Sequence, residues 1–119
     1  MTLRHHGRRL AAPAILATAF ALAACSSTPP PTAEMRGARD AVARAQDDGA
    51  AQLAPQPFEL AQGKLAKAQA DVTNNKNDAA RRWAEQAQAD ADFAAASSNA
   101  QKAEHTASEL TDAENGLQR

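Results

Sequence analysis

Residues 57–73, PFELAQGKLAKAQADVT, decide the fold. Apolar residues recur along this stretch at steps of three and four, at Phe58, Ala61, Leu65, Ala68 and Val72. Such spacing places apolar side chains on one side of an α-helix, as in a coiled-coil seam. Gly63 lies off this side and costs only about 1 kcal/mol relative to alanine. The stretch therefore predicts a helix over about residues 57–73.

A longer helix is predicted downstream, over about residues 78–111. The polar connection of residues 73–77 is so short that the two helices should be antiparallel. One apolar stripe of this helix runs from Ala80 to Ala94, and a second, from Phe93 to Leu110, drifts onto a neighbouring face. At 1.5 Å per residue the helix would be about 50 Å long, twice its neighbours. Its C-terminal half is expected to project or fray, with residues 97–99 as the weakest point.

A third helix is predicted upstream, over about residues 33–48. Its stripe consists of Met35, Ala38, Val42 and Ala45. Gly49 is expected to end it. Residues 50–57 are expected to form a corner, because proline inside a helix removes a donor and clashes with the preceding turn. Thr32 and Asn77 are the expected N-caps of the first and last helices.

The predicted fold class is all-α, an antiparallel helical hairpin or a small three-helix bundle with a long C-terminal helix. Residues 33–112 form the alanine-rich helical domain, and residues 113–119 form a C-terminal tail. Of the 95 residues from position 25 onward, 25 are alanine and only 11 are Val, Leu, Met, Phe or Trp. Alanine favours the helix but buries little area. Self-association or a partner helix is therefore expected to add stability.

The N-terminus is typical of an exported precursor. Arg4, Arg8 and Arg9 precede the uncharged residues 10–24, a stretch too short for a permanent bilayer span. General Sec export fits the flanking residues better than the twin-arginine route. Residues 22–25, LAAC, resemble the lipobox of bacterial lipoproteins, in which a peptidase cleaves before a cysteine whose thiol carries lipid.

This resemblance predicts a lipoprotein signal peptide over residues 1–24, cleavage between Ala24 and Cys25, and lipidation of Cys25. Residues 25–32 are the lipidated cysteine and a proline-rich tether. Ser26 occupies the position at which aspartate commonly signals inner-membrane retention in enterobacterial lipoproteins, so the periplasmic face of the outer membrane is the expected location. The alternative is an ordinary cleavage site followed by an incidental cysteine.

The charge balance argues against a nucleic-acid partner. The chain has 13 Lys and Arg against 14 Asp and Glu. Removal of the leader leaves 10 basic and 14 acidic residues, so no basic excess is present. The expected partners are the membrane, through the lipid anchor, and an envelope protein or a second copy of the chain.

Residues with catalytic or metal-binding chemistry are sparse. His105 is the sole imidazole outside the leader and is expected on a solvated helix face. Asp90 and Asp92, two residues apart, should point to different sides of a helix. Oxygen-bearing residues alternate over 71–77 as in a calcium loop, but the central glycine is missing and Arg82 stands where a bidentate glutamate belongs. No catalytic residue, metal or cofactor is predicted.

Trp83, the single tryptophan, is the candidate for contact with a partner. Its position beside the alanine stripe favours a core residue that packs against Leu65 or Phe58, and the alternative is an exposed anchor. Two ion pairs with i, i+4 spacing are expected on helix surfaces, namely Asp40–Arg44 and Asp78–Arg82.

Four segments carry a family resemblance: residues 25–31 (CSSTPPP), 49–55 (GAAQLAP), 59–68 (ELAQGKLAKA) and 80–91 (ARRWAEQAQADA). They resemble small alanine-rich bacterial envelope proteins with a helical domain of unknown function, which occurs alone on a lipoprotein or upstream of an OmpA-like domain. The resemblance implies an envelope location and helical architecture, and it carries over no catalytic residue. Because the sequence ends at Arg119, peptidoglycan binding through an OmpA-like domain is not expected.

The predicted function is that of a non-catalytic outer-membrane lipoprotein, a structural or adaptor module that acts in the periplasm through helix–helix contacts. The alternative is a cell-wall-associated tether that contacts peptidoglycan. Covalent attachment of the Braun type uses a C-terminal lysine, which Arg119 does not readily replace. An enzyme is a third hypothesis, with no constellation of residues to support it.

Overall fold

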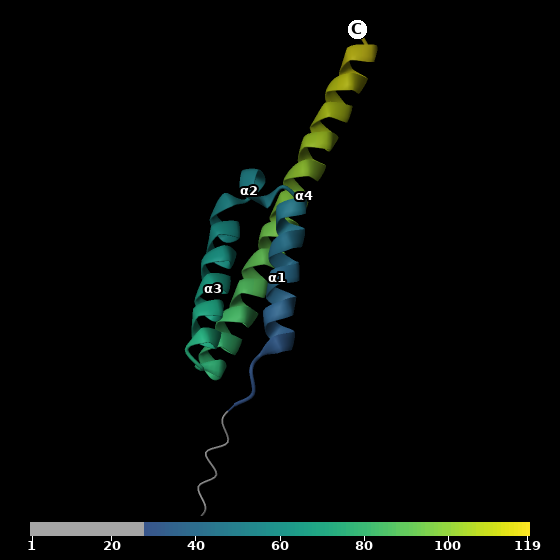
Figure 1. Cartoon of the computed structure of the whole chain (residues 1–119). Coiled ribbons are helices and arrows are strands. Elements are labelled where there is room, and N and C mark those ends of the chain that lie inside the picture. The colour runs from purple at the N-terminus through teal and green to yellow at the C-terminus, as the bar shows by residue number, and fades with distance from the viewer. Residues whose placement is uncertain (1–27) are drawn as a thin grey trace, which may run out of the picture.

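The computed structural model describes residues 28–119, and every regular element within them is a helix (Figure 1). The elements in chain order are α1 (Thr32–Asp47), α2 (Ala50–Leu53), α3 (Pro55–Thr73) and α4 (Asn77–Leu117). The predicted all-α class with a long C-terminal helix is confirmed. The predicted signal peptide, its cleavage site and Cys25 lie outside the described residues.

α4 is the central helix of the bundle. It packs along both α1 and α3, and these two helices contact each other much less. Figure 1 shows α1 and α4 running in the same direction, with α3 antiparallel to both. Of the two predicted arrangements, the structure therefore has the three-helix bundle. The short helix α2 joins α1 to α3 at the end of the bundle opposite the α3–α4 hairpin.

Gly49 ends α1, as expected. Its φ of 79° lies in the left-handed region, which glycine adopts without steric penalty. The N–H groups of Asp48 and Gly49 donate to the carbonyls of Arg44 and Gln46, each over 2.9 Å. These bonds satisfy carbonyls that would otherwise lack a partner at the helix end.

The corner predicted over residues 50–57 is wrong in its extent. The chain forms the short helix α2 and then enters α3 at Pro55, so that Ala54 alone separates the two. Pro55 and Pro57 are tolerated because the first turn of a helix needs no backbone donors. Proline breaks a helix only farther in, where each N–H bonds the preceding turn.

The α3–α4 hairpin turns at Asn75, whose φ is 57°. The N–H of Lys76 donates to the carbonyl of Asp71 over 2.8 Å and closes the turn. The predicted N-caps are wrong: Thr32 and Asn77 are the first residues of α1 and α4, and neither helix has a side-chain cap hydrogen bond.

The chain that enters α1 is attached to this hairpin. The side-chain amide of Asn77 donates to the carbonyl of Thr28 over 2.6 Å. The Thr28 hydroxyl donates to the carboxylate of Asp78 over 3.1 Å. The described part of the chain therefore starts at the hairpin end of the bundle, opposite to α2.

The core consists of two clusters of mostly alanine side chains. The α2 cluster comprises Ala41, Ala45, Ala50, Ala54, Phe58, Ala61, Ala91 and Ala94. The hairpin cluster comprises Met35, Ala38, Ala68, Ala84 and Ala87. Phe58 and Met35 are the large members, each 5% exposed. The predicted stripe of α1 needs one correction, because Ala41 is fully buried and Val42 only half-buried.

α4 continues as a helix well beyond the bundle (Figure 1). Ser98 is its last buried residue, and its hydroxyl donates to the carbonyl of Ala94 over 2.8 Å. This bond satisfies the buried hydroxyl, so α4 passes unbroken through 97–99 and the predicted weak point is wrong. Residues 99–117, here called the tip, are exposed and helical. Among the described helices, none combines the length and apolar character that spanning a bilayer requires.

Candidate functional site

One face of α4 carries an exposed apolar stripe, which we call the outer seam. It consists of Ala89, Phe93, Ala96, Ala100, Ala103, Ala107 and Leu110. All seven residues are exposed, Phe93 to 65% and Leu110 to 63%. Their steps of four and three keep them on one side of the helix. The buried residues of α4 lie on the other side, where they pack against α1 and α3.

Three ion pairs join α4 to its neighbouring helices, and one of them links Arg81 Nε on α4 to the carboxylate of Glu34 on α1 over 2.9 Å. Lys64 Nζ on α3 lies 2.7 Å from the carboxylate of Asp90, and Arg44 Nη2 on α1 lies 3.0 Å from that of Asp92. The two aspartates thus face different neighbouring helices and share no site, as their spacing predicts. The side of α4 that remains carries the outer seam, which is exposed. At one edge of the seam, Phe93 also lines a shallow cavity with Leu53 of α2 and Pro57 of α3.

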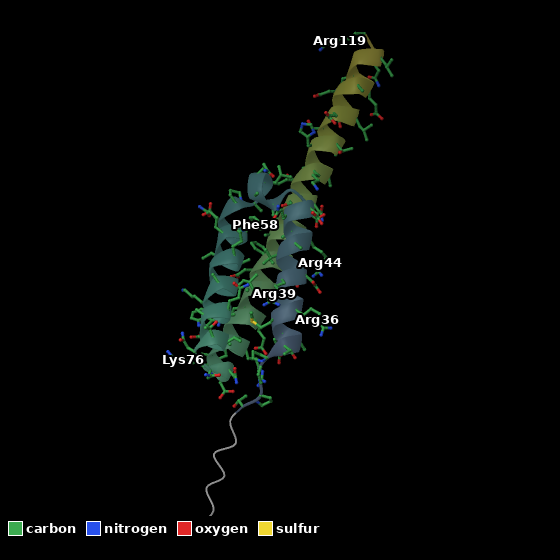
Figure 2. The ribbon with its side chains drawn as sticks, viewed as in Figure 1. Arg36, Arg39, Arg44, Phe58, Lys76 and Arg119 are labelled. Atoms are coloured by element: carbon green, nitrogen blue, oxygen red, sulfur yellow. The ribbon has the colours of Figure 1, made fainter. Side chains whose placement is uncertain are left out.

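The base of the tip is held on one side by α2 and the end of α1. Gln101 donates its side-chain amide to the carbonyl of Leu53, and Asn99 donates to the carboxylate of Asp48 over 3.3 Å. A shallow cavity beside these contacts reaches Thr106. Toward Arg119, Figure 2 shows α4 extending past the other helices, with no other described element beside it.

Trp83 is half-buried and packs against the hairpin cluster, to which Leu65 also contributes. Phe58, the other expected neighbour, belongs to the α2 cluster. The Nζ of Lys67 lies 4.7 Å from the centroid of the Trp83 ring, within the range of a cation–π contact. The Trp83 ring thus packs against the core and is also partly exposed to solvent.

The residues weighed above as metal ligands do not come together in the described chain. His105 is exposed on the tip, and its Nδ1 lies 3.5 Å from the carboxylate of Glu109. In the turn over 71–77, the carbonyl of Asp71 accepts from Lys76, and the Thr73 hydroxyl donates one turn back along α3. Within residues 28–119 no group of three or more His, Cys, Asp and Glu side chains is placed to hold a metal ion.

Neither expected i, i+4 ion pair forms in the described chain. Arg44 reaches across to Asp92 of α4, because α4 packs closely against α1 at this point. Asp78 accepts a hydrogen bond from Thr28. Arg82 is left exposed and makes no ion pair with any residue of 28–119.

A cavity of about 340 Å³ opens between the start of α1 and the end of α3. Pro31, Met35 and Val72 supply apolar lining, and Arg39 is its one charged residue. Its lining contains hydroxyl groups but neither an imidazole nor a carboxylate that could act as a base beside them. This cavity offers shape and one positive charge, with no arrangement for nucleophilic chemistry.

Sequence reasoning found the stripe from Phe93 to Leu110 but missed Ala89, which a step of four back from Phe93 would have added. It also missed the contact of Lys64 with Asp90, because the partners of an ion pair between helices depend on how the helices align. The residue spacing within one helix does not show how that helix aligns with its neighbours.

Comparison with known families finds one domain model that matches residues 33–110, described as a domain of unknown function, DUF4398. Comparison with curated proteins finds no match. Comparison with solved structures also finds none. The match ends at Leu110, so the whole outer seam lies inside the matched region. Because the match covers more than half of the chain, the protein belongs to the DUF4398 family, whose domain has no assigned function.

Proposed function

We propose that the protein is a non-catalytic adaptor lipoprotein of the outer membrane, which presents α4 to an envelope partner through helix–helix contacts. The observation that carries this proposal is the outer seam. Seven apolar side chains lie exposed at coiled-coil spacing, although α4 already has α1 and α3 as neighbours. An extended apolar face that the fold leaves open is characteristic of an interaction surface.

The anchor and location rest on the sequence. The charged and then apolar leader, the LAAC residues at 22–25 and the serine at position 26 support a lipid on Cys25 and the periplasmic face of the outer membrane. Two or three acyl chains on one cysteine would give stable attachment. The polar, proline-rich tether would separate the helical bundle from the membrane surface.

The test is photo-crosslinking in cells, with a photoreactive residue at position 103 on the outer seam. Ala66, exposed on α3 and away from the seam, is the matched control position. We expect a discrete protein adduct from position 103 and none from position 66. Retention of the adduct with the cell wall would instead favour the peptidoglycan-contacting alternative. The same weak background from both positions would contradict the adaptor proposal.

A further inference from the structure

The outer seam is longer than its apolar part, because charged residues continue its spacing at both ends. A step of three before Ala89 leads to Gln86, and a step of four before that leads to Arg82. After Leu110, a step of four leads to Glu114 and a step of three to Leu117. The seam thus has a positive charge toward the hairpin end and a negative charge in the tip.

These two charges lie symmetrically about the point at which α4 leaves the bundle. Arg82 precedes Ser98, the last buried residue, by sixteen positions, and Glu114 follows it by sixteen. Both side chains are exposed, and neither has an ion-pair partner among the described residues. A helix with opposite charges at equal distances from a centre is complementary to an antiparallel copy of itself.

We propose that the occupant of the outer seam is the outer seam of a second copy of this chain, antiparallel and centred on Ser98. This inference rests on the proposed function, since it names the partner of the same face. In this register Arg82 pairs with Glu114 of the second copy, and Glu114 with its Arg82. The tip of each copy then packs against the part of the other copy's α4 that lies within its bundle.

The same register matches large side chains with small ones. Phe93 lies opposite Ala103 of the second copy, and Ala96 lies opposite Ala100, so the helices can approach closely around the centre. Ala89 lies opposite Ala107. Ser97 and Asn99, which flank the centre, are both uncharged. Seam positions therefore bring no like charges together.

A parallel pair is disfavoured by the same residues. It would bring Arg82 against Arg82 and Glu114 against Glu114, and like charges at such positions destabilise a helix pair. It would also align the two helix dipoles, whereas antiparallel packing opposes them. The charge pattern of the seam thus selects one orientation.

The contact is large enough for a specific but modest association. Overlap of residues 79–117 is about 57 Å long at 1.5 Å per residue. With a contact strip about 10 to 12 Å wide, each copy covers roughly 600 Å², the lower end for specific complexes. Because alanine supplies most of the seam, we expect dissociation constants on the order of micromolar.

Disulfide trapping tests orientation and register in the full chain carrying Cys25→Ser, which leaves no native thiol. A mixture of Ala89→Cys and Ala107→Cys chains, distinguished by a tag, is expected to form a mixed disulfide. Ala89→Cys alone should not form a dimer, because its two copies would lie about 27 Å apart along the helices. A disulfide of Ala89→Cys with itself would show a parallel pair and overturn the proposal. So would a mixture of Ala96→Cys and Ala107→Cys that links faster than the first mixture, because that would show another register.

Charge reversal supplies an independent readout by sedimentation equilibrium. Arg82→Glu and Glu114→Arg should each weaken the dimer roughly tenfold, since two ion pairs per dimer become repulsive. The chain carrying both changes should recover the dimer, and Glu109→Arg, exposed on the tip but off the seam, should leave it unchanged. Far-ultraviolet circular dichroism of each variant checks that the helices remain.

If the purified chain stays monomeric at a protein concentration about 100-fold above the expected dissociation constant, the self-pairing proposal is overturned. If position 103 nevertheless yields an adduct with a different envelope protein in cells, the adaptor proposal survives and only the occupant is wrong. If position 103 yields nothing beyond the control while the purified chain forms the predicted mixed disulfide, the self-pairing stands and the proposed envelope role falls.

Discussion

The ammonium group of Lys67 lies 4.7 Å from the centre of the Trp83 ring and links α3 to α4 on the outside of the hairpin cluster. The ring contacts the alanine core on one side and Lys67 on the solvent side. This geometry indicates that Trp83 stabilises the fold mainly by packing, and to a smaller extent through its cation–π contact with Lys67.

We therefore expect Trp83→Ala to lower the free energy of unfolding by about 2 to 3 kcal/mol, less than for a fully buried tryptophan because the ring is half-buried. Lys67→Ala should cost about 0.5 to 1 kcal/mol. Urea unfolding followed by circular dichroism measures both changes. Equal effects of the two substitutions would contradict the assignment of the ring to the core.

The bundle should resist larger side chains at its buried alanines. Ala87 is fully buried where α4 meets the hairpin cluster. Ala87→Leu should destabilise the chain by about 1 to 3 kcal/mol, since the added methylenes force the helices apart. Ala66→Leu, at an exposed position of α3, is the matched control and should be within about 0.5 kcal/mol of the parent. Thermal unfolding of the two variants makes the comparison.

Two glycines should respond in opposite directions to the same substitution. Gly63 lies in the interior of α3 with open space where a Cβ would stand, so Gly63→Ala should stabilise the chain by about 1 kcal/mol. Gly49→Ala should destabilise it by about 1 kcal/mol or more, because the φ of 79° strains any residue with a Cβ. Midpoints of urea unfolding test the pair. A gain in stability from both variants would be inconsistent with the end of α1 described above.

Two of the ion pairs between α4 and its neighbours, Lys64–Asp90 and Arg44–Asp92, should differ in strength. The Lys64 and Asp90 side chains are 24% and 27% exposed, whereas those of Arg44 and Asp92 are 60% and 52% exposed. Double-mutant cycles should give a coupling of about 0.5 to 1 kcal/mol for the first pair and near zero for the second. Repeating the cycles in 1 M salt should leave much of the first coupling in place, because partly buried charges are screened less than exposed ones. A stronger Arg44–Asp92 coupling would refute this ranking.

Anchoring through Cys25 is tested in the cell. Cys25→Ala should abolish incorporation of labelled palmitate and leave the precursor uncleaved, since no thiol is available to carry lipid. Ser26→Ala is the matched control and should be lipidated and cleaved normally. Labelling, gel mobility and membrane fractionation together provide the readout. A Cys25→Ala chain that is still processed would favour the ordinary cleavage site.

The sequence predicted the helical class because the three-and-four spacing over 57–73 and the absence of proline over 78–111 are local signals. It failed where the outcome depends on neighbours. The spacing predicts Val42 on the buried side of α1, but Ala41 is fully buried there and Val42 only half-buried. Pro55 and Pro57 predict a break in the helix, but both lie in the first turn of α3, where proline is tolerated.

For the candidate site, the stripe from Phe93 to Leu110 was predicted from spacing alone. That this stripe is the exposed one could not be predicted, since both stripes of α4 are alanine-rich. In the structure the stripe from Ala80 to Ala94 packs against α1 and α3, Asp90 and Asp92 pair with Lys64 and Arg44, and the outer seam is left outside. Such contacts between helices leave no trace in the periodicity of one segment.

The attachment of Thr28 to Asn77 and Asp78 sets the mechanics of the molecule. The chain enters at the hairpin end and the tip leaves at the opposite end, so a pull between them is directed lengthwise along α1 and α4. Such a load shears the whole interface between the two helices at once, instead of peeling it apart one turn at a time. The described bundle therefore resists a pull applied between residue 28 and the tip better than a pull that peels α1 away from α4.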